Sequence, residues 1–328
     1  MPSVTVIIPA RPDAVEIDAV SAARALDYPP EKLEIILARG KQPSAQRNAA
    51  LKDARGDLIY FLDDDSVPES KNLRRIIGHF SDPDVKMVGG PAICPADAPP
   101  LEQTFALVLA SWALGPSRAR YTPVGTVRQT SEKELILCNL VARRAALLEL
   151  GGFNEKLYPN EENALMDELQ ARGGKLLYDA QLIVRRRPRR TLTAFAKMLM
   201  TYGRGRAEQF RVNPTPGSAL NFVPPLFLIY FLLLVPATIH WGSIVLWPFV
   251  LYLAAVFAQA LFLTRSGRIR ESFAAIPLII LTHILYGFGF WRGLFTPLKV
   301  KPPAAAEVSL ENCHNVTNKV CPRLKDPE

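Results

Sequence analysis

Three consecutive aspartates, Asp63, Asp64 and Asp65, follow an apolar segment at residues 58–62. Adjacent carboxylates repel one another, so in an apolar setting a cation must neutralise them. In an extended chain Asp63 and Asp65 point to one side and can share one ion, while Asp64 points to the other. Carboxylate oxygens suit Mg²⁺ or Mn²⁺, and such an ion would bridge to the phosphates of a nucleotide. The triplet therefore predicts a divalent metal site, with an acidic turn or helix cap before Pro68 as the alternative.

Two glutamates, Glu161 and Glu162, form a second acidic pair directly before a helical pattern at residues 164–172. The helix dipole favours carboxylates at a helix N-terminus, which explains one glutamate without any chemistry. A carboxylate held near a sugar hydroxyl can also remove its proton as a general base during displacement at the anomeric carbon. On these residues alone, both the helix cap and the general base remain open.

The aspartates follow the third strand of a predicted βαβαβ unit. Apolar runs at residues 4–8, 33–37 and 58–62 alternate with helical patterns at residues 15–26 and 43–54. We expect an α/β fold with a Rossmann-like, mixed but mostly parallel sheet. Ligands of such folds bind outside the carboxyl ends of the strands, where Asp63 stands.

The C-terminal part has the composition of membrane helices. Residues 212–264 contain no Asp, Glu, Lys or Arg, whereas about 20 apolar residues suffice for one span. We expect one span near residues 221–239, a second near 244–263 and a third candidate within 271–292. The chain should therefore be a multi-pass membrane protein.

Positive charges flank the third candidate span on both sides. Arg265, Arg268 and Arg270 precede it, which places this loop in the cytoplasm under the positive-inside rule. Three full spans would put the C-terminal tail outside, but the basic residues after the segment place the tail inside. We therefore expect one segment to be re-entrant or interfacial, and Pro224-Pro225 makes the first span the candidate.

A basic linker precedes the membrane part. Residues 185–211 hold nine basic side chains and one acidic one. Arg190, Lys197, Arg204 and Arg211 recur every seven residues, opposite the apolar face formed by Phe195, Met198, Leu199 and Tyr202, which predicts an amphipathic helix on the membrane surface. Arg206 falls on the apolar side, so we expect it to face the active site and to bind donor or lipid phosphate.

Several motifs stand in a fixed order along the chain. They are Val6-Ile7-Ile8-Pro9, Gln46-Arg47-Asn48, Gly56 to Asp65, Gly151-Gly152-Phe153-Asn154-Glu155 and Asn160-Glu161-Glu162. Together they resemble the family 2 glycosyltransferases of GT-A fold over about residues 3–210. The later Tyr202-Gly203-Arg204-Gly205-Arg206, followed by membrane helices, looks most like the succinoglycan-type membrane glucosyltransferases.

The resemblance implies roles for individual residues. Asp63 and Asp65 match the DxD motif, which holds Mg²⁺ or Mn²⁺ against the diphosphate of a nucleotide sugar. Glu162 matches the general base, with Glu161 beside it, and the reaction inverts the anomeric centre by direct displacement. The predicted donor-binding residues are Pro9, Arg11, Asp13, Lys41, Arg47, Asp63, Asp64, Arg204 and Arg206.

The sequence also departs from the family pattern. Many relatives carry an Asp after the second strand that contacts the nucleotide base, whereas this chain has Ala38-Arg39-Gly40-Lys41 there. Asp13 is a possible substitute. The base position is usually Asp rather than Glu, which leaves Glu161 as an alternative to Glu162. No QxxRW motif of processive synthases occurs, so we expect addition of a single sugar.

The predicted organisation has four parts. Residues 1–184 form a GT-A catalytic domain, 185–211 the basic linker helix, 212–296 a membrane region with two to three spans, and 297–328 a flexible tail. The net charge of +8 lies in the linker and membrane region, which points to anionic membrane lipids and excludes nucleic acid as the expected partner.

These features predict a membrane-bound, metal-dependent, inverting hexosyltransferase. It would move a hexose from a nucleotide-diphosphate sugar to a polyprenyl-diphosphate-linked saccharide in surface polysaccharide or glycan biosynthesis. We expect it in the inner membrane, with the catalytic domain facing the cytoplasm. Two alternatives remain, a polyprenyl-phosphate sugar synthase and a catalytically silent membrane scaffold of the same fold.

Overall fold

Three parallel strands form the centre of the main sheet. They are β1 (Val4–Ala10), β2 (Leu33–Arg39) and β3 (Leu58–Phe61), and β1 pairs with both neighbours. Their side chains are almost all buried, as expected for parallel strands with helices on both faces. This computed structural model describes residues 1–157, 160–298 and 308–313. The predicted strands therefore exist at the predicted places.

The sheet continues with strands of mixed direction. Further members are β5 (Val85–Gly89), β7 (Arg128–Gln129), β8 (Leu140–Arg143), β9 (Lys175–Tyr178) and β11 (Ser309–Asn312). In the described part of the chain the order is β11-β2-β1-β3-β8-β5-β9-β7. β8 runs antiparallel between β3 and β5, and β5 pairs parallel with β9. The sheet is mixed with a parallel centre, which confirms the predicted fold class.

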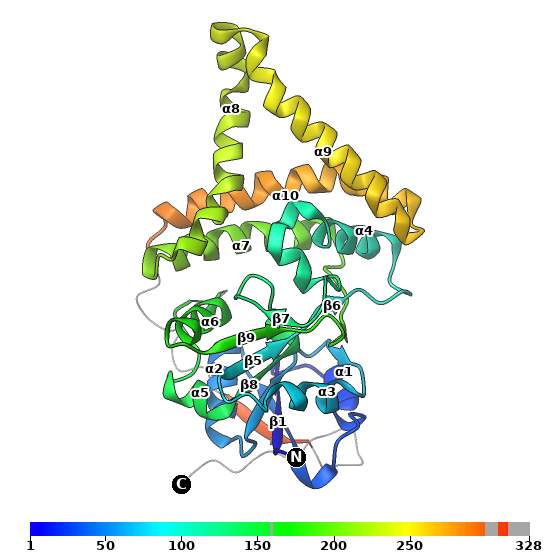
Figure 1. Ribbon diagram of the computed structural model, residues 1–328, viewed down its shortest axis with the longest axis vertical. Coiled ribbons are helices and arrows are strands. Elements are labelled where there is room, and N and C mark those ends of the chain that lie inside the picture. Colours follow the sequence, from blue (N-terminus) through cyan, green and yellow to red (C-terminus); the bar gives the residue numbers. More distant parts are fainter. Residues whose placement is uncertain (158–159, 299–307, 314–328) are drawn as a thin grey trace.

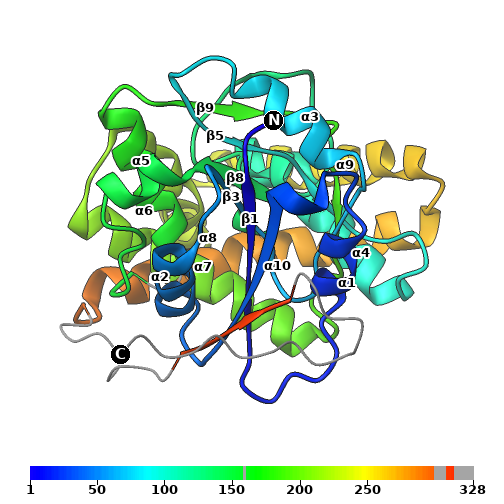
Figure 2. The same ribbon diagram turned by 90° about the horizontal axis from the view of Figure 1, so that it is seen from below.

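Helices cover both faces of this sheet, as Figure 2 shows. On one face lie α1 (Asp18–Arg24) and α3 (Asn72–His79). On the other lie α2 (Pro43–Asp53), α5 (Arg144–Glu149) and α6 (Glu161–Ala171). Each layer buries its own apolar cluster against the strands, so the ends of the strands are held rigidly.

A small second sheet joins the start of the predicted linker to the aspartates. It consists of β4 (Val67–Pro68), β10 (Val184–Arg185) and β6 (Ala92–Ile93), with β10 in the middle. β4 begins two residues after Asp65 and pairs antiparallel with β10. Arg185 is thus part of this small sheet, and the linker helix begins at Leu192, later than we expected.

The rest of the described chain is helical (Figure 1). Helices α4 (Pro100–Leu109), α7 (Leu192–Val212) and α10 (Ile269–Phe295) form a layer above the α/β domain. Helices α8 (Val223–Trp241) and α9 (Trp247–Leu263) extend away from this layer as a hairpin. Short 3₁₀ segments are η1 (Pro30–Lys32), η2 (Trp112–Arg120), η3 (Leu137–Asn139), η4 (Pro216–Phe222), η5 (Ser243–Leu246) and η6 (Thr264–Ser266). Three helical stretches in the described residues are long and apolar enough to cross a membrane, which supports membrane association.

Glycines allow α7 and α10 to touch backbone to backbone. A Cβ on Gly203 would lie 2.1 Å from the Tyr286 carbonyl oxygen, and one on Gly289 would lie 2.1 Å from the Met200 carbonyl oxygen. The apolar face of α7 is covered in the same way, because Phe195 stacks on Phe105 of α4 with ring centroids 4.2 Å apart. The apolar face that we expected on a membrane surface is therefore largely buried inside the protein.

Part of the predicted flexible tail is ordered. Residues 309–312 form β11, which pairs antiparallel with β2 at the edge of the main sheet. An ion pair between Arg39 Nε and Glu311 Oε1, 2.8 Å apart, strengthens this pairing. The expectation of a flexible tail was wrong for this segment, and most of the remaining tail lies outside the described residues.

Candidate active site

A pocket of about 950 Å³ lies at the carboxyl ends of the central strands. Parallel strands bring their carboxyl ends to one edge, so the loops after β1, β2 and β3 meet there. The α/β domain contributes Pro9, Ala10, Arg11, Pro12, Asp13, Gly40, Lys41, Arg47, Asp63, Asp64, Glu161 and Glu162, among others. The helical layer contributes Trp112, Leu114, Arg120, Leu199, Tyr202, Arg206, Val223, Pro224, Thr282, His283 and Tyr286. The pocket therefore joins the predicted donor site to the apolar helices.

Asp63 and Asp65 converge on one cationic side chain. Arg186 places Nη1 3.0 Å from Asp63 Oδ2 and Nε 2.7 Å from Asp65 Oδ1. Arg47 Nη2 lies 3.0 Å from the other oxygen of Asp63. Burial pushes the pKa of Asp63 upward, but the charges of Arg186 and Arg47 outweigh it, so this pKa lies below its ordinary value.

This geometry fits a divalent cation. Two carboxylates that already hold one cationic group between them can hold a metal ion at the same place. Within residues 1–157, 160–298 and 308–313, no group of three or more His, Cys, Asp or Glu side chains is placed to bind a metal. A metal at Asp63 and Asp65 would therefore complete its ligand set with water or phosphate oxygens. Asp64 lines the pocket, and burial together with its charged neighbours raises its pKa.

The two glutamates have different surroundings at the start of α6. Glu161 is buried, accepts a hydrogen bond from the Asn160 amide at 3.1 Å and pairs with Arg47 Nη1 at 3.2 Å. Burial and the neighbouring Glu162 raise the pKa of Glu161 to about 7. Glu162 lines the pocket and accepts a hydrogen bond from Asn163 Nδ2 at 3.2 Å. Glu162 is thus the better placed of the two to meet an acceptor.

Arg47 connects the two acidic groups. Its guanidinium contacts both Asp63 and Glu161 and is only 6% exposed. Because the chain brings residues 47, 63 and 161 together at the edge of the sheet, the predicted metal site and the predicted base belong to one network. The position of Arg47 within α2 is set by an N-cap, in which the Gln42 side chain accepts a hydrogen bond from the Ala45 amide.

The predicted nucleotide-binding residues lie along the pocket. Pro9 is near the end of β1, Arg11, Asp13 and Lys41 come from the loops after β1 and β2, and all four line it. Sequence reasoning gave no role to Gln46, which fixes these loops. Its Nε2 donates to the carbonyl oxygens of Ala10 at 2.7 Å and Ala38 at 2.6 Å. The sequence does hold a signal for this role of Gln46, because a polar glutamine stands on the buried face of the helix predicted at residues 43–54.

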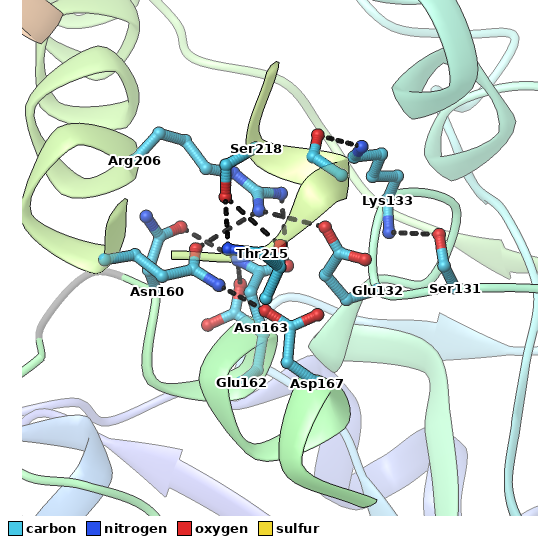
Figure 3. Close-up of polar contacts among 12 residues, drawn as sticks. Ser131, Glu132, Lys133, Asn160, Glu162, Asn163, Asp167, Arg206, Thr215 and Ser218 are labelled. Carbon is cyan, nitrogen blue, oxygen red and sulfur yellow. Dashed lines mark hydrogen bonds and ion pairs between the residues drawn. The ribbon is translucent and has the colours of Figure 1, made fainter. Parts of the chain in front are cut away.

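Arg206 lines the pocket, on the side that the helical wheel predicted, and Figure 3 shows its side chain pointing toward Glu132 and Asn163. Its binding of donor or lipid phosphate stays a prediction. Arg206 is buried, and Nη1 lies 3.3 Å from Glu132 Oε1 while Nη2 lies 3.3 Å from Asn163 Oδ1. Arg204 does not line the pocket, contrary to our prediction. It pairs with Glu208 one turn along α7, at 3.3 Å, because residues two apart on a helix point in different directions.

Further cations line the pocket that we did not assign to the site. Arg120 donates through Nη2 to Asn163 Oδ1 at 2.8 Å, and its burial lowers its pKa. Arg186 and Arg189 come from the segment between β10 and α7. In the sequence, Arg186 and Arg189 appear only as part of a basic run. Their contacts depend on strand pairing between distant segments, which leaves no local signal.

A polar network lies beside Arg206 and links α6 to α7 (Figure 3). Gln209 Nε2 donates to Asp167 Oδ2 at 2.8 Å. Burial, with Glu132 nearby, raises the pKa of Asp167 to about 6. This network positions α6, and with it Glu162, relative to the helical layer.

Comparison with known proteins agrees with this geometry. Residues 19–104 match the model of glycosyl transferase family 2. The pre-mycofactocin glycosyltransferases of two Mycobacterium tuberculosis strains, CDC 1551 / Oshkosh and ATCC 25618 / H37Rv, are each 28% identical over 144 residues. The match covers 44% of this chain and 30% of those relatives.

A solved structure shares the fold over most of its length. The mannosyltransferase PcManGT from Pyrobaculum calidifontis, in complex with GDP-Man and Mn²⁺, has a TM-score of 0.52 and 19% identity, over 90% of this chain and 87% of that one. None of these comparisons points to succinoglycan-type enzymes in particular. The chain therefore has a GT-A-like fold, of which residues 19–104 match the glycosyl transferase family 2 model.

Proposed function

We propose that this protein is a membrane-bound inverting glycosyltransferase. It moves a hexose from a nucleotide-diphosphate sugar to a polyprenyl-diphosphate-linked saccharide, one sugar at a time, in surface polysaccharide or glycan synthesis. The observation that carries this proposal is the shape of the pocket. Its lining combines Asp63, after β3, and Glu162 with Pro224 and Tyr286 of the apolar helices.

The donor binds at the end formed by the α/β domain. The loops with Asp13 and Lys41 hold the nucleotide, and Asp63 and Asp65 hold Mg²⁺ or Mn²⁺ in place of Arg186. When bound, the metal supplies positive charge that stabilises the departing diphosphate. GDP-Man and Mn²⁺ in the PcManGT complex support this assignment, since the fold is shared.

Glu162 acts on the acceptor as general base. It removes the proton from the acceptor hydroxyl while that oxygen forms a bond to the anomeric carbon and the bond from this carbon to the diphosphate breaks. The proton goes to Glu162 and the electron pair leaves with the nucleoside diphosphate. Attack from the face opposite the leaving group inverts the anomeric centre. Glu161, buried against Arg47, orients the base and the metal site together.

The acceptor enters from the membrane side. Pro224, Tyr286 and Trp112 all line the pocket and offer a polyprenyl chain an apolar way out toward the lipid. Anionic lipids and the acceptor diphosphate are the expected partners of the cations there. Arg265, Arg268 and Arg270 support a cytoplasmic catalytic domain at the inner membrane.

A second candidate is a polyprenyl-phosphate sugar synthase. Arg120, Lys133 and Arg189 line the pocket and could hold an acceptor phosphate, which needs no strong base. The variant Glu162→Gln separates the candidates. We expect it to lower turnover about 100-fold or more with a hydroxyl acceptor, whereas near-normal turnover would favour the phosphate acceptor. Glu168→Gln, on the exposed side of the same helix, is the matched control.

The first experiment is a panel of nucleotide sugars incubated with the purified protein and a membrane lipid extract, with and without a chelator. Transfer of a hexose to a lipid-extractable product that stops on chelation supports the proposal. Transfer that survives removal of the metal would contradict the role of Asp63 and Asp65. If no nucleotide sugar binds in the presence of Mn²⁺, the silent-scaffold alternative holds instead.

A further inference from the structure

The helix α10 has the length and composition of a span, but its start is held by the segment after β6 and its end by α7. Arg268, directly before the helix, donates through Nη2 to the Ala96 carbonyl oxygen at 2.9 Å. Near the other end, Arg211 Nη1 donates to the Gly293 carbonyl oxygen at 3.1 Å. Ala96 follows β6, and Arg211 belongs to the last turn of α7. A helix that crossed the bilayer would have one end far from this layer.

The last third of α10 packs against helices of the same layer. Its backbone contacts α7 at Gly289 and Gly293 and the start of α8 at Gly287. In the most apolar stretch of α10, 33% of the residues are buried inside the protein. The corresponding shares for the two helical stretches of the hairpin are 6% and 17%. Figure 1 shows α10 running along α7 and across the base of the hairpin. One side of α10 is therefore apolar because it packs against protein, while the apolar residues on its other side are exposed.

The strand β11 provides an independent constraint. It follows α10 in the chain and pairs with β2 of the α/β domain, with Leu310 opposite Ala38. Residues 309–312 therefore lie on the same side of any membrane as the α/β domain. The chain between this domain and β11 must cross the bilayer an even number of times, so three full spans are excluded.

The helices α8 and α9 carry the features of true spans. The continuous helical stretches are 25 and 24 residues long, about 36 Å at ~1.5 Å per residue, enough for a hydrocarbon core of ~30 Å. Their large apolar side chains are exposed, for example Leu232 at 68% and Val235 at 69%. Trp241, at the turn of the hairpin, is 66% exposed and suits the far interface.

We propose that α8 and α9 cross the membrane as a hairpin, that α10 lies in the plane of the membrane surface, and that the N-terminus and β11 both stay on the side of the α/β domain. The partner of α10 is the lipid itself. Phe273, Phe288 and Phe295 are 39%, 55% and 80% exposed and fall within an arc of about 60° at ~3.6 residues per turn. This side faces the acyl chains, while the glycine side faces α7. The segment that does not span is thus the third, and not the first as Pro224-Pro225 suggested.

The test uses the full-length chain with one epitope tag, placed at the N-terminus, after Gly242 at the turn of the hairpin, or at the C-terminus. Antibody is added to cells from which the layers outside this membrane have been removed, before and after the membrane itself is permeabilised. We expect the tag after Gly242 to be reached before permeabilisation and both terminal tags only after it.

Each other outcome overturns a stated part of the proposal. A C-terminal tag reached in intact cells, with the N-terminal tag protected, would mean an odd number of crossings and an α10 that spans. A protected tag after Gly242 would mean that the hairpin does not reach the far side. Turnover is not measured, so the result is independent of the proposed transferase activity.

Discussion

Arg186 competes with any metal for Asp63 and Asp65, so its removal should strengthen metal binding. Its guanidinium contacts one oxygen of each aspartate, at 3.0 Å and 2.7 Å. A metal at this place must first displace the guanidinium and break both ion pairs. In the variant Arg186→Gln the two carboxylates no longer have this partner, and the repulsion between the arginine and the metal is lost as well. We therefore expect tighter binding of Mn²⁺ in the absence of any nucleotide.

The size of the effect follows from the exposure of the two ion pairs. The side chains of Arg186, Asp63 and Asp65 are 27%, 22% and 44% exposed, so each pair contributes about 0.5–1 kcal/mol and not the larger value of a buried pair. Breaking both costs about 1–2 kcal/mol. With ~1.4 kcal/mol per factor of ten, the Kd for Mn²⁺ should fall roughly 5- to 30-fold in Arg186→Gln.

The assay is titration of the purified protein with Mn²⁺, with free ion followed by electron paramagnetic resonance. Arg185→Gln is the matched control, because Arg185 pairs with the exposed Glu69 at 3.2 Å and should leave the Kd unchanged. Arg186→Lys keeps the positive charge but lacks the forked guanidinium that contacts both aspartates. We therefore expect a Kd between those of wild type and Arg186→Gln. An unchanged or higher Kd in a folded Arg186→Gln protein would refute the competition between arginine and metal.

Three further predictions test packing, titration and loop geometry. Gly289→Ala places a methyl group against the backbone of α7 and should lower the unfolding midpoint of the detergent-solubilised protein. Gly78→Ala, with open space around it, should not lower this midpoint. Equal midpoints for the two variants would contradict the close crossing of α7 and α10. Because the pKa of Asp167 is raised to about 6, the folded state favours its protonated form, and wild type loses stability from this group as the pH rises from about 4 to above 6. Asp167→Asn does not titrate, so its midpoint relative to wild type should increase between pH 4.5 and 7.5, and a constant difference would argue against the shift. Gln46→Ala removes the side-chain donor to the carbonyl oxygens of Ala10 and Ala38, although the Ala10 oxygen keeps the Gly40 amide as a donor. With about 0.5–1.5 kcal/mol for each of the two lost hydrogen bonds, it should cost about 1–3 kcal/mol of unfolding free energy in a denaturant titration, against no measurable loss for the exposed Gln181→Ala.

The central strands and the place of the site could be read from the sequence because both depend on local patterns. Apolar runs of strand length, separated by helical patterns, predict β1, β2 and β3. The rule that ligands bind at the carboxyl ends of parallel strands then places Asp63 at the pocket. Glu162 entered through its motif, and the structure brings it to the same pocket. Only the place of Asp63 follows from the strand pattern itself, because it comes directly after β3.

The remaining features depend on contacts between distant segments, which a local pattern does not contain. Arg186 reaches the aspartates only because β10 pairs with β4, more than 100 residues earlier in the chain. The helical wheel of α7 shows an apolar face but not what covers it, and here α4 and α10 do so in place of lipid. Likewise, α10 has the length and hydropathy of a span, because protein contact and lipid contact both favour apolar residues.

The arginines 185–187 show how such contacts change the meaning of a charge pattern. As a run they read as a solvated basic face for lipid head groups, yet each pairs with a carboxylate of a different element. Arg185 contacts Glu69 after β4, Arg186 contacts the aspartates after β3, and Arg187 contacts Glu102 of α4 at 2.8 Å. Glu102 is only 3% exposed, so breaking its pair would leave a buried charge uncompensated. The run therefore ties α4, and through it the layer with α10, to the aspartate site.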